Sequence, residues 1–456
     1  MVYKELQAVV LAGGKGSRMT ELTARQIKCL LPIGNMPLIW YPLQLLQNTG
    51  FKKVIIVVSE NVKGDISQAL EKLNLNIKLD IVGIPDAEDI GTADSIRHIH
   101  DKIQKDFIVV SCDLITNIDM KAFLNVYRNH NASITALLLA TPKVPEDIIT
   151  PGPKIKQSTE TDLIGIDNET DRLVFLASAS DFEETIKISR NLMRKHVAFT
   201  IHSKLMDAHL YIIRKWVLDF LVYNKSFSTL KGELLPYIVK KQFSKSLQQM
   251  IDDKNTSLMN IDIKNDVYRF ATEEPLDELA RKLSGYIDHN TDMENVYCND
   301  IIRCYAHVVK GKFGLRVNTI QMYNLANIKV SNWFGNIASE NKIPEISPKA
   351  TIKCTQMEAC RVAANTFIDA KTSIKESHIG PNTTIEQKTR ISQSIIMENV
   401  TIKERCVIQN CILCNGCIIE EGTQLKDCLV GAQHVVKADS NHSREMLAEA
   451  DQLIEI

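Results

Sequence analysis

Aliphatic residues recur at a fixed spacing in the last quarter of the chain, and this repeat restricts the possible folds more than any other feature. One set lies seventeen residues apart and consists of Ile379, Ile396, Leu413 and Val430. Further aliphatic residues follow these at steps of six, six and five. Such a hexapeptide repeat is typical of a parallel β-helix, whose coils bury one another's aliphatic side chains. The sequence therefore predicts a β-helix over 346–440 and a C-terminal tail over 441–456.

The register of this repeat also offers an interpretation of the cysteines, of which the chain has 11. Small residues share columns of the repeat: Cys360, Ser377, Ser394, Cys411 and Cys428 in one, and Thr372, Thr389, Cys406 and Thr423 in another. Because serine, threonine and cysteine interchange there, we interpret them as small packing residues. The short gaps between Cys411, Cys414 and Cys417 are compatible with the alternative, a zinc or iron site.

Strand-like and helix-like segments alternate in the first half of the chain. Apolar runs predict buried parallel strands at 6–12, 51–59, 78–84, 106–112 and 132–140. Segments of helical period lie between or after them at 39–50, 61–73, 91–103 and 120–130. Strands that alternate with helices indicate a doubly wound α/β sheet. With further strand-like and helix-like segments downstream, this domain is expected to cover 1–243.

A connecting segment, 244–345, fits neither pattern. Its first part, 244–260, is polar, 273–283 has a helical period, and 303–334 alternates as strands do. We expect a partly ordered segment that docks on the neighbouring domain.

Composition excludes several classes of protein. The chain has 54 basic and 55 acidic side chains, a formal charge of −1, which argues against a protein that coats nucleic acid. The sequence shows neither an uninterrupted apolar stretch long enough to span a membrane nor a signal-peptide pattern at its start. A cytosolic protein is expected.

A glycine-rich stretch follows the first predicted strand. It contains Gly13, Gly14, Gly16, Ser17 and Arg18, and Lys28 follows ten residues after Arg18. Glycines let the backbone approach a phosphate closely, and the two cations would neutralise its charge. The stretch is neither a Walker loop nor a dinucleotide fingerprint. An ordinary turn and a phosphate-binding loop are therefore both open interpretations.

Four motifs together resemble one enzyme superfamily. LAGGKGSRM at 11–19, KCLLPIGNMPLI at 28–39, GTADSI at 91–96 and CDLI at 112–115 are similar to the sugar-nucleotide pyrophosphorylases, or nucleotidyltransferases. These enzymes transfer a nucleotide onto a sugar 1-phosphate and release pyrophosphate. The resemblance implies that Arg18 and Lys28 handle phosphates, and that Asp113 and Asp207 hold one Mg²⁺.

The sequence departs from that superfamily at three places. Ile27 stands where the enzymes usually have proline, and His209 stands where they usually have a small residue. The stretch 172–184, RLVFLASASDFEE, lacks the lysine that contacts the sugar phosphate in the enzymes. Loss of this cation removes charge-assisted hydrogen bonds worth about 1.5–3 kcal/mol each. We therefore expect no catalytic residues and no metal, and only a residual nucleotide-binding role for the glycine stretch and Lys28.

The combination of a degraded nucleotidyltransferase-like domain with a β-helix resembles a second, narrower family. It is similar to the subunits of eukaryotic initiation factor 2B that carry both domains, whose β-helix is left-handed. This resemblance implies a regulatory subunit, without cofactor, of the factor that exchanges GDP for GTP on initiation factor 2. The chain reaches Ile456 without the helical exchange domain of the epsilon subunit. The implied partners are the epsilon subunit, the alpha, beta and delta core subunits and initiation factor 2, without direct contact to nucleic acid or membrane.

Two other functions remain as alternatives. An active pyrophosphorylase of the GDP-mannose type would use Mg²⁺ with Arg18, Lys28, Asp113 and Asp207. A nucleotide-sensing regulatory subunit of such an enzyme would bind without turnover.

Overall fold

The computed structural model of the chain describes residues 5–85, 90–142, 145, 148–153, 161–181, 185–196, 198–244, 266–272, 275–276, 279, 301–337 and 344–448. The chain forms two compact units, and neither is continuous in sequence. The first consists of Met1–Gly13, Leu45–Thr141 and Ser158–Gly314. The second consists of Gly14–Gln44, Pro142–Gln157 and Leu315–Ile456. These two units therefore differ from the predicted domains, whose boundaries were expected after 243 and 345. The difference arises because 14–44 and 142–157, although distant in sequence, belong to the same unit as the β-helix.

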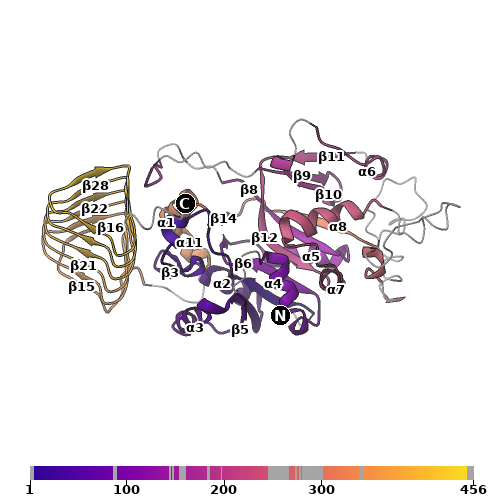
Figure 1. Ribbon diagram of the computed structural model, residues 1–456, viewed down its shortest axis with the longest axis horizontal. Coiled ribbons are helices and arrows are strands. Elements are labelled where there is room, and N and C mark those ends of the chain that lie inside the picture. Colours follow the sequence, from indigo (N-terminus) through magenta and orange to yellow (C-terminus); the bar gives the residue numbers. More distant parts are fainter. Residues whose placement is uncertain are drawn as a thin grey trace. The chain divides into compact units, whose positions relative to one another are not determined.

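A seven-stranded sheet forms the centre of the first unit, in the order β13-β8-β12-β6-β1-β4-β5 (Figure 1). Its strands are β1 (Gln7–Leu11), β4 (Lys53–Ser59), β5 (Lys78–Ile84), β6 (Phe107–Ser111), β8 (Ile134–Ala140), β12 (Leu205–Ile213) and β13 (Cys304–Val308). All of them run parallel except β12, which pairs antiparallel with both β6 and β8. The predicted α/β fold is confirmed, with one reversed strand inside the sheet.

Helices connect these strands, as the periodic segments predicted. They are α2 (Trp40–Thr49), α3 (Lys63–Glu71), α4 (Thr92–His98), α5 (Met120–Asn129), α7 (Lys215–Tyr223) and α8 (Leu235–Lys241). An antiparallel sheet of β10 (Leu173–Ser178), β9 (Asp162–Asp167) and β11 (Phe199–His202), with α6 (Arg190–Lys195), completes the described unit. Val9, Val109 and Phe220 are among the buried residues of one aliphatic and aromatic core. Burial of such side chains provides the main driving force for this arrangement.

The connecting segment supplies both a strand and a long helix. Residues Cys304–Val308 form β13, which pairs in parallel with β8 and covers an otherwise open sheet edge. Gly314–Arg316 form the short strand β14. The strand-like interpretation is wrong beyond this point, because Ile320–Ile337 form the helix α11. Its buried residues Tyr323, Ala326 and Val330 follow a spacing of three and four, which is the helical period that the sequence interpretation overlooked.

The predicted β-helix is present in the second unit as three parallel sheets of six strands (Figure 1). The first sheet contains β15 (Thr351–Ile352), β18 (Phe367–Ile368), β21 (Thr384–Ile385), β24 (Thr401–Ile402), β27 (Ile418–Ile419) and β30 (Val435–Val436). The second contains β16 (Gln356–Glu358), β19 (Ser373–Lys375), β22 (Arg390–Ser392), β25 (Val407–Gln409), β28 (Gln424–Lys426) and β31 (Asn441–Ser443). The third contains β17 (Arg361–Val362), β20 (His378–Ile379), β23 (Ile395–Ile396), β26 (Ile412–Leu413), β29 (Leu429–Val430) and β32 (Met446–Leu447).

The β-helix continues past its expected end at residue 440. Strands β31 and β32 occupy positions that we had expected to begin a tail. His442 pairs with Leu425, so a histidine stands where earlier coils carry an aliphatic residue. Backbone pairing between coils continues through β31 and β32, although the column of aliphatic residues ends before His442. The aliphatic spacing therefore predicted the end of the β-helix too early.

Small residues form hydrogen-bonded columns inside the β-helix, in agreement with their predicted packing role. The side chains of Ser377, Ser394 and Cys411 each donate to the carbonyl two residues earlier, at 2.7, 2.8 and 3.1 Å. In the next coil, the amide of Cys411 donates to Oγ of Ser394 at 3.1 Å. Burial raises the pKa of Cys414 to about 12, which keeps this thiol protonated. Among the residues that the structure describes, no group of three or more Cys, His, Asp or Glu side chains is arranged to hold a metal ion.

The N-terminal part of the second unit packs against the third sheet of the β-helix. A short hairpin of β2 (Pro32–Ile33) and β3 (Met36–Pro37) turns at Gly34 and Asn35, both with positive φ. Asn35 Nδ2 donates to the carbonyl of Ile379 at 3.1 Å. Helix α11 joins both, because Asn327 Oδ1 accepts from the amide of Gly34 and its carbonyl accepts from His378 Nε2.

This packing covers a face of the β-helix that would otherwise expose aliphatic residues. Ile395, Ile412 and Leu429 precede the inward-facing residues of their strands, yet they are 4%, 0% and 1% exposed. Ile149, from the returning segment 142–157, also reaches this unit through its carbonyl, which accepts from Asn410 at 2.9 Å. The described part of the chain contains no helix that combines the length and apolarity needed to cross a membrane.

Candidate functional site

The first unit brings three of the predicted site residues to one edge of its large sheet. Gly13 and Asp113 both lie just past the carboxyl ends of neighbouring parallel strands, since Leu11 of β1 pairs with Ser111 of β6. Strand β12 runs antiparallel to β6 and begins at the same edge, where Asp207 precedes the paired residue Leu210 by three positions. Ligands of open α/β sheets bind outside the carboxyl ends of the strands. The topology therefore supports a shared site for these residues.

The carboxylate of Asp207 is engaged by its own strand. Its Oδ1 accepts from the amide of His209 at 2.8 Å, and its Oδ2 accepts from the hydroxyl of Tyr211 at 2.6 Å. His209 has φ +50°, and the register with β8 shifts between Asp207 and Tyr211. These contacts stabilise a bulge, a device that re-aims side chains near sites. Asp207 thus has a structural task that the sequence interpretation did not foresee.

Asp113 is also withdrawn from solvent. It is 1% exposed and lies between β6 and the short strand β7 (Leu114–Thr116). Two carboxylates at one sheet edge are the type of group that Mg²⁺ prefers, together with phosphate oxygens. However, both oxygens of Asp207 already accept hydrogen bonds, so the described geometry gives no basis for a step that runs through the metal.

The remaining residues of the glycine stretch belong to the second unit. Gly16 has φ +81°, and a Cβ atom there would lie 2.8 Å from Cγ2 of Thr23, so this position requires glycine. Thr23 Oγ1 and the amide of Met19 both donate to the carbonyl of Gly16, at 3.2 and 2.8 Å. The stretch is therefore a tight turn that closes on α1 (Thr20–Thr23).

Packing does not explain the glycine at position 14. Apart from the atoms of Gly14 itself and its two chain neighbours, no described atom lies within 4 Å of the place where its Cβ would be. Ser17 and Arg18 are exposed, whereas Lys28 is half-buried and begins a short 3-10 turn, Lys28–Leu30. An open backbone followed by the exposed Arg18 suits an anionic ligand, and the predicted phosphate-binding role of this stretch and Lys28 stays a prediction.

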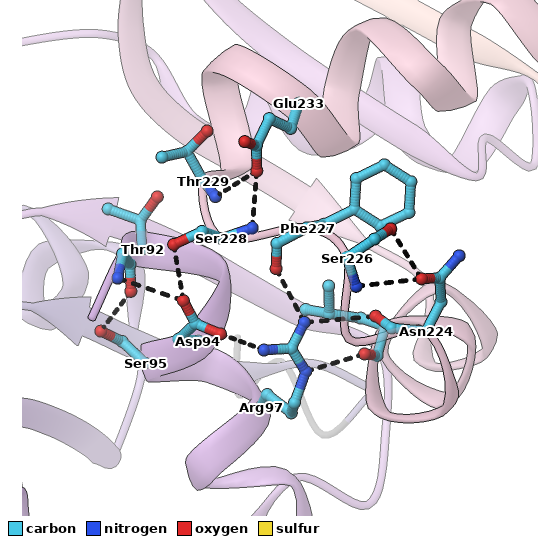
Figure 2. A network of polar contacts seen from close by, with 12 residues as sticks. Thr92, Asp94, Ser95, Arg97, Asn224, Ser226, Phe227, Ser228, Thr229 and Glu233 are labelled. Atoms are coloured by element: carbon cyan, nitrogen blue, oxygen red, sulfur yellow. Dashed lines mark hydrogen bonds and ion pairs between the residues drawn. The ribbon is translucent and has the colours of Figure 1, made fainter. Parts of the chain in front are cut away.

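The GTADSI motif forms a clamp on a distant loop, as Figure 2 shows. The carbonyl of Ser228 accepts from the amides of Ala93 and Asp94 at the start of α4, at 2.8 and 3.4 Å. Ser228 Oγ donates to Asp94 Oδ2 at 2.7 Å, and the amide of Leu230 donates to Thr92 Oγ1 at 2.9 Å. The first amides of α4 are thus satisfied from within the chain.

Arg97 holds the same loop from the other side (Figure 2). Its Nε donates to the carbonyl of Leu221 at 2.9 Å, and its Nη2 donates to those of Asn224 and Phe227 at 3.2 and 2.7 Å. Its Nη1 forms an ion pair with Asp94. A planar guanidinium suits this divergent set of acceptors.

The clamp leaves no room beside Gly91. A Cβ atom at Gly91 would lie 2.2 Å from the carbonyl oxygen of Ser228. Glu233 fixes the loop further, since its Oε2 accepts from the amides of Ser228 and Thr229 at 2.6 and 2.9 Å (Figure 2). The motif therefore serves loop packing in this chain. The sequence motif does not indicate the roles of Arg97 and Glu233, because the backbone partners of Arg97 lie more than a hundred residues away and those of Glu233 lie in the loop before it.

The stretch that lacks the sugar-phosphate lysine ends in hydroxyl and carboxylate groups. Strand β10 ends at Ser178, whose hydroxyl lies 2.8 Å from that of Ser180. The Ser178 amide donates to Asp181 Oδ2 at 3.3 Å. Within the described residues of this stretch, the only cation is Arg172, at its start, which is buried and donates to Gln242 and to the carbonyl of Ile302. No cation of this stretch is therefore available to a ligand.

Two family descriptions match the chain. The nucleotidyl transferase family matches residues 7–147, and the left-handed β-helix (LbH) domain of eIF2B subunit epsilon matches residues 345–441. The second match agrees with the three stacked parallel sheets and identifies the β-helix as left-handed. The two matches fall on the α/β sheet and on the β-helix, in agreement with the two domain types predicted from the sequence.

Known proteins resemble the chain over one or both domains. Translation initiation factor eIF2B subunit gamma of Schizosaccharomyces pombe is 34% identical over 250 residues, which cover 53% of this chain and 53% of that protein. The gamma subunit of Dictyostelium discoideum is 28% identical over 414 residues, 83% of this chain and 88% of that protein. A putative mannose-1-phosphate guanyltransferase of Sulfolobus acidocaldarius is 27% identical over 199 residues, 42% of this chain and 54% of that protein. The match to the Schizosaccharomyces protein thus spans about half of that relative, whereas the match to the Dictyostelium protein spans most of it.

Proposed function

We propose that this chain is a non-catalytic subunit of the guanine-nucleotide exchange factor for translation initiation factor 2. We propose that it belongs, with the eIF2B gamma subunits, to the nucleotidyltransferase-like proteins that carry a left-handed β-helix. The observation that carries this proposal is the 414-residue similarity to the Dictyostelium gamma subunit. It crosses both domains and the connecting segment. A similarity limited to the sheet domain would have fitted any nucleotidyltransferase equally well.

The architecture supports an assembly role. The β-helix is a regular stack of parallel sheets whose third face is covered by α11 and the hairpin, and among the described residues the second sheet carries exposed side chains such as Arg390 and Gln424. Flat, regular faces suit large protein interfaces. We propose that the chain pairs with an epsilon subunit and joins a core of alpha, beta and delta subunits in the cytosol. In that assembly it would help to hold initiation factor 2.

The site supports a role without nucleotidyl transfer. Both oxygens of Asp207 are engaged, α4 is closed by Ser228, and β10 offers no ligand-binding cation. The hydrogen bonds weaken Asp207 as a phosphate or metal ligand, and the described part of β10 lacks the cation that transfer to a sugar phosphate would need. The turn from Gly13 to Arg18, with Lys28, is still suited to bind a nucleotide or sugar nucleotide without turnover.

A tagged pull-down from cytosol tests the assembly directly. The co-purifying chains are identified by mass spectrometry. We expect a longer paralogue with an added helical domain, the three core subunits and initiation factor 2. Recovery of the chain alone, or with an enzyme of sugar metabolism, would contradict the proposal.

A GDP-release assay tests the absence of catalysis. Initiation factor 2 is loaded with fluorescent GDP and mixed with the purified chain, with its co-purifying assembly, or with the assembly lacking this chain. We expect release by the assembly and none by the chain alone. Release by the isolated chain at the rate of the whole assembly would disprove the proposed role.

An active GDP-mannose-type pyrophosphorylase is the second candidate, favoured by the similarity to the Sulfolobus protein. In that case Asp113 and Asp207 would hold Mg²⁺, which would neutralise phosphate charge beside Arg18 and Lys28. The test measures pyrophosphate release from GTP with mannose 1-phosphate and Mg²⁺. Turnover that disappears in Asp113→Asn would establish this candidate, and an inert wild-type chain would eliminate it.

A further inference from the structure

The small antiparallel sheet of the first unit carries an unusually basic surface. It consists of Lys187, Arg190, Arg194 and Lys195 around α6 and of Lys240 and Lys241 at the end of α8, and is called the α6 surface below. From residue 185 to residue 206 the chain contains no Asp or Glu. This local excess stands out in a chain whose formal charge is −1.

Helix α6 is firmly attached, so its outer side is a preformed surface. Leu192 is 2% exposed and packs with Val174 and Phe243. The Asn191 side chain donates to the carbonyl of Phe243 at 3.2 Å, which holds α6 beside the end of α8. His196, directly after the helix, lies 3.1 Å from Asp167 Oδ1. A surface held in this way loses little conformational freedom when it binds a partner.

The charges of this surface face solvent. Lys187, Arg190 and Arg194 are exposed, as is Lys240. Within the described residues, none of these four forms an ion pair with a carboxylate. Their electrostatic attraction is therefore available to an external acidic group.

Apolar side chains accompany the cations. Met193 is 56% exposed between Arg190 and Arg194, and Ile186 is 38% exposed beside Lys187. Flexible methionine is common at protein-binding surfaces, because it adapts to apolar partners. A polynucleotide site would instead be expected to offer exposed aromatic rings for base stacking, whereas His196, Phe199 and Tyr237 around this surface are buried or half-buried. The mixture of cations with Ile186 and Met193 favours a protein partner.

We propose that the α6 surface binds an acidic protein segment that carries aliphatic side chains. Carboxylates of the segment pair with Arg190, Arg194 and the neighbouring lysines, and its aliphatic residues cover Met193 and Ile186. Charge complementarity selects the partner and steers its approach, while the apolar contacts add affinity. This inference goes beyond the proposed subunit role and does not depend on it.

The test uses the full-length chain, with any chains that co-purify with it, and three fluorescent probes. The first is a short peptide of Glu and Asp interspersed with Leu, the second replaces every Leu by Ser, and the third is a single-stranded RNA of equal length. Fluorescence anisotropy at low and physiological salt measures binding. We expect the first peptide to bind most tightly and its affinity to fall with salt.

Charge reversal then locates the binding surface. The double variant Arg190→Glu, Arg194→Glu is expected to weaken the first peptide by about tenfold or more, equivalent to about 1.4 kcal/mol. The matched control is Lys371→Glu, Lys388→Glu, which makes the same charge change at exposed corners of the β-helix. This control is expected to change affinity by less than about twofold, because it affects only long-range attraction.

A second variant isolates the apolar contribution. Met193→Ser is expected to weaken the first peptide but not the Leu-free peptide. Because Met193 and both arginines are exposed, these variants should retain the wild-type circular dichroism spectrum. The proposal is overturned by tighter binding of RNA than of the first peptide, by equal binding of the two peptides, by an equal effect of the control reversal, or by no binding of the first peptide.

Discussion

The β-helix and the seven-stranded sheet unit both have dense aliphatic cores, but they satisfy their buried polar groups over different distances along the chain. In the β-helix, Ser394 Oγ accepts from the amide of Cys411, seventeen residues on. In the sheet unit, Ser228 binds Asp94 across 134 residues and Phe227 binds Arg97 across 130. Contacts of the β-helix kind recur every seventeen residues, so their position in one coil predicts their position in the next. Those of the second kind occur once and depend on the whole fold.

The largest expected effect tests how local the β-helix is. Ile402 is fully buried, and Ile402→Ala should lower the free energy of unfolding by about 2–5 kcal/mol through lost apolar burial and a cavity. Because a coil contacts mainly its neighbours, amide exchange should increase around Ile385 and Ile419, which pair with it, and not in the seven-stranded sheet. Urea unfolding and hydrogen exchange measure both effects.

The neighbouring residue provides the control for this experiment. Thr401→Ala changes a half-exposed side chain of the same strand and should alter stability by less than about 0.5 kcal/mol. Equal loss of protection in both units after Ile402→Ala would show that the comparison between a local and a non-local unit is false.

Removal of the Arg97 guanidinium should have a similar or slightly smaller effect on the sheet unit. Arg97→Ala leaves three carbonyls and Asp94 without this donor, and we expect a loss of about 2–4 kcal/mol. Hydrogen exchange and limited proteolysis should show opening of the loop 224–229. Arg97→Lys keeps the charge without the planar fork and should recover less than half of the loss. Unchanged protection of the loop in Arg97→Ala would refute its role as a clamp.

Protonation of His378 should weaken the packing of α11 on the β-helix. Burial, with a smaller contribution from the nearby Arg361 guanidinium, lowers the pKa of His378 to about 4 against the opposing effect of the hydrogen bond to the Asn327 carbonyl. The unfolded chain therefore takes up the proton first. The stability contribution is complete above pH 6.5 and is lost as pH falls from 6.5 to 4, by up to about 3 kcal/mol.

Urea unfolding between pH 7.5 and pH 4.5 measures this dependence. His378→Gln keeps a side-chain N–H donor toward Asn327 without a group that titrates in this range. We expect the variant to lose part of the acid sensitivity of the wild type. The same pH dependence in both proteins would assign the acid sensitivity to other groups.

The smallest effects test whether the columns of the β-helix tolerate exchange of small residues. Ser394→Ala removes the acceptor of a buried amide and should cost about 1–3 kcal/mol. Cys411→Ser keeps a donor and an acceptor at the equivalent position of the next coil, so it should cost less than about 1 kcal/mol. Urea unfolding compares the two. A larger cost for Cys411→Ser would favour a specific role for the thiol.

The sequence predicted the β-helix almost residue by residue because each coil repeats the preceding one, and the prediction failed where His442 replaces an aliphatic residue. In the sheet unit it predicted the strands, whereas the roles of Gly13, Asp113 and Asp207 came from the family resemblance and stay predictions. It did not predict the hydrogen bond from the Tyr211 hydroxyl to Asp207, because the sequence does not distinguish an aspartate that accepts such a bond from one that does not. Helix α11 was mistaken for strands because short apolar runs fit both periods.

The hairpin at Gly34 and Asn35 has a consequence for the order in which the protein acquires its structure. Its partners are Asn327 and Ile379, 293 and 344 residues later in the chain. During synthesis this early segment emerges long before the residues that cover it, and contacts between distant residues slow folding. Residues 14–44, which include most of the glycine turn and Lys28, therefore reach their final packing only after the β-helix has begun to form. Shortened chains that end before the β-helix should leave Asn35 without its partner Ile379, and chains that end before α11 should also leave Gly34 without Asn327.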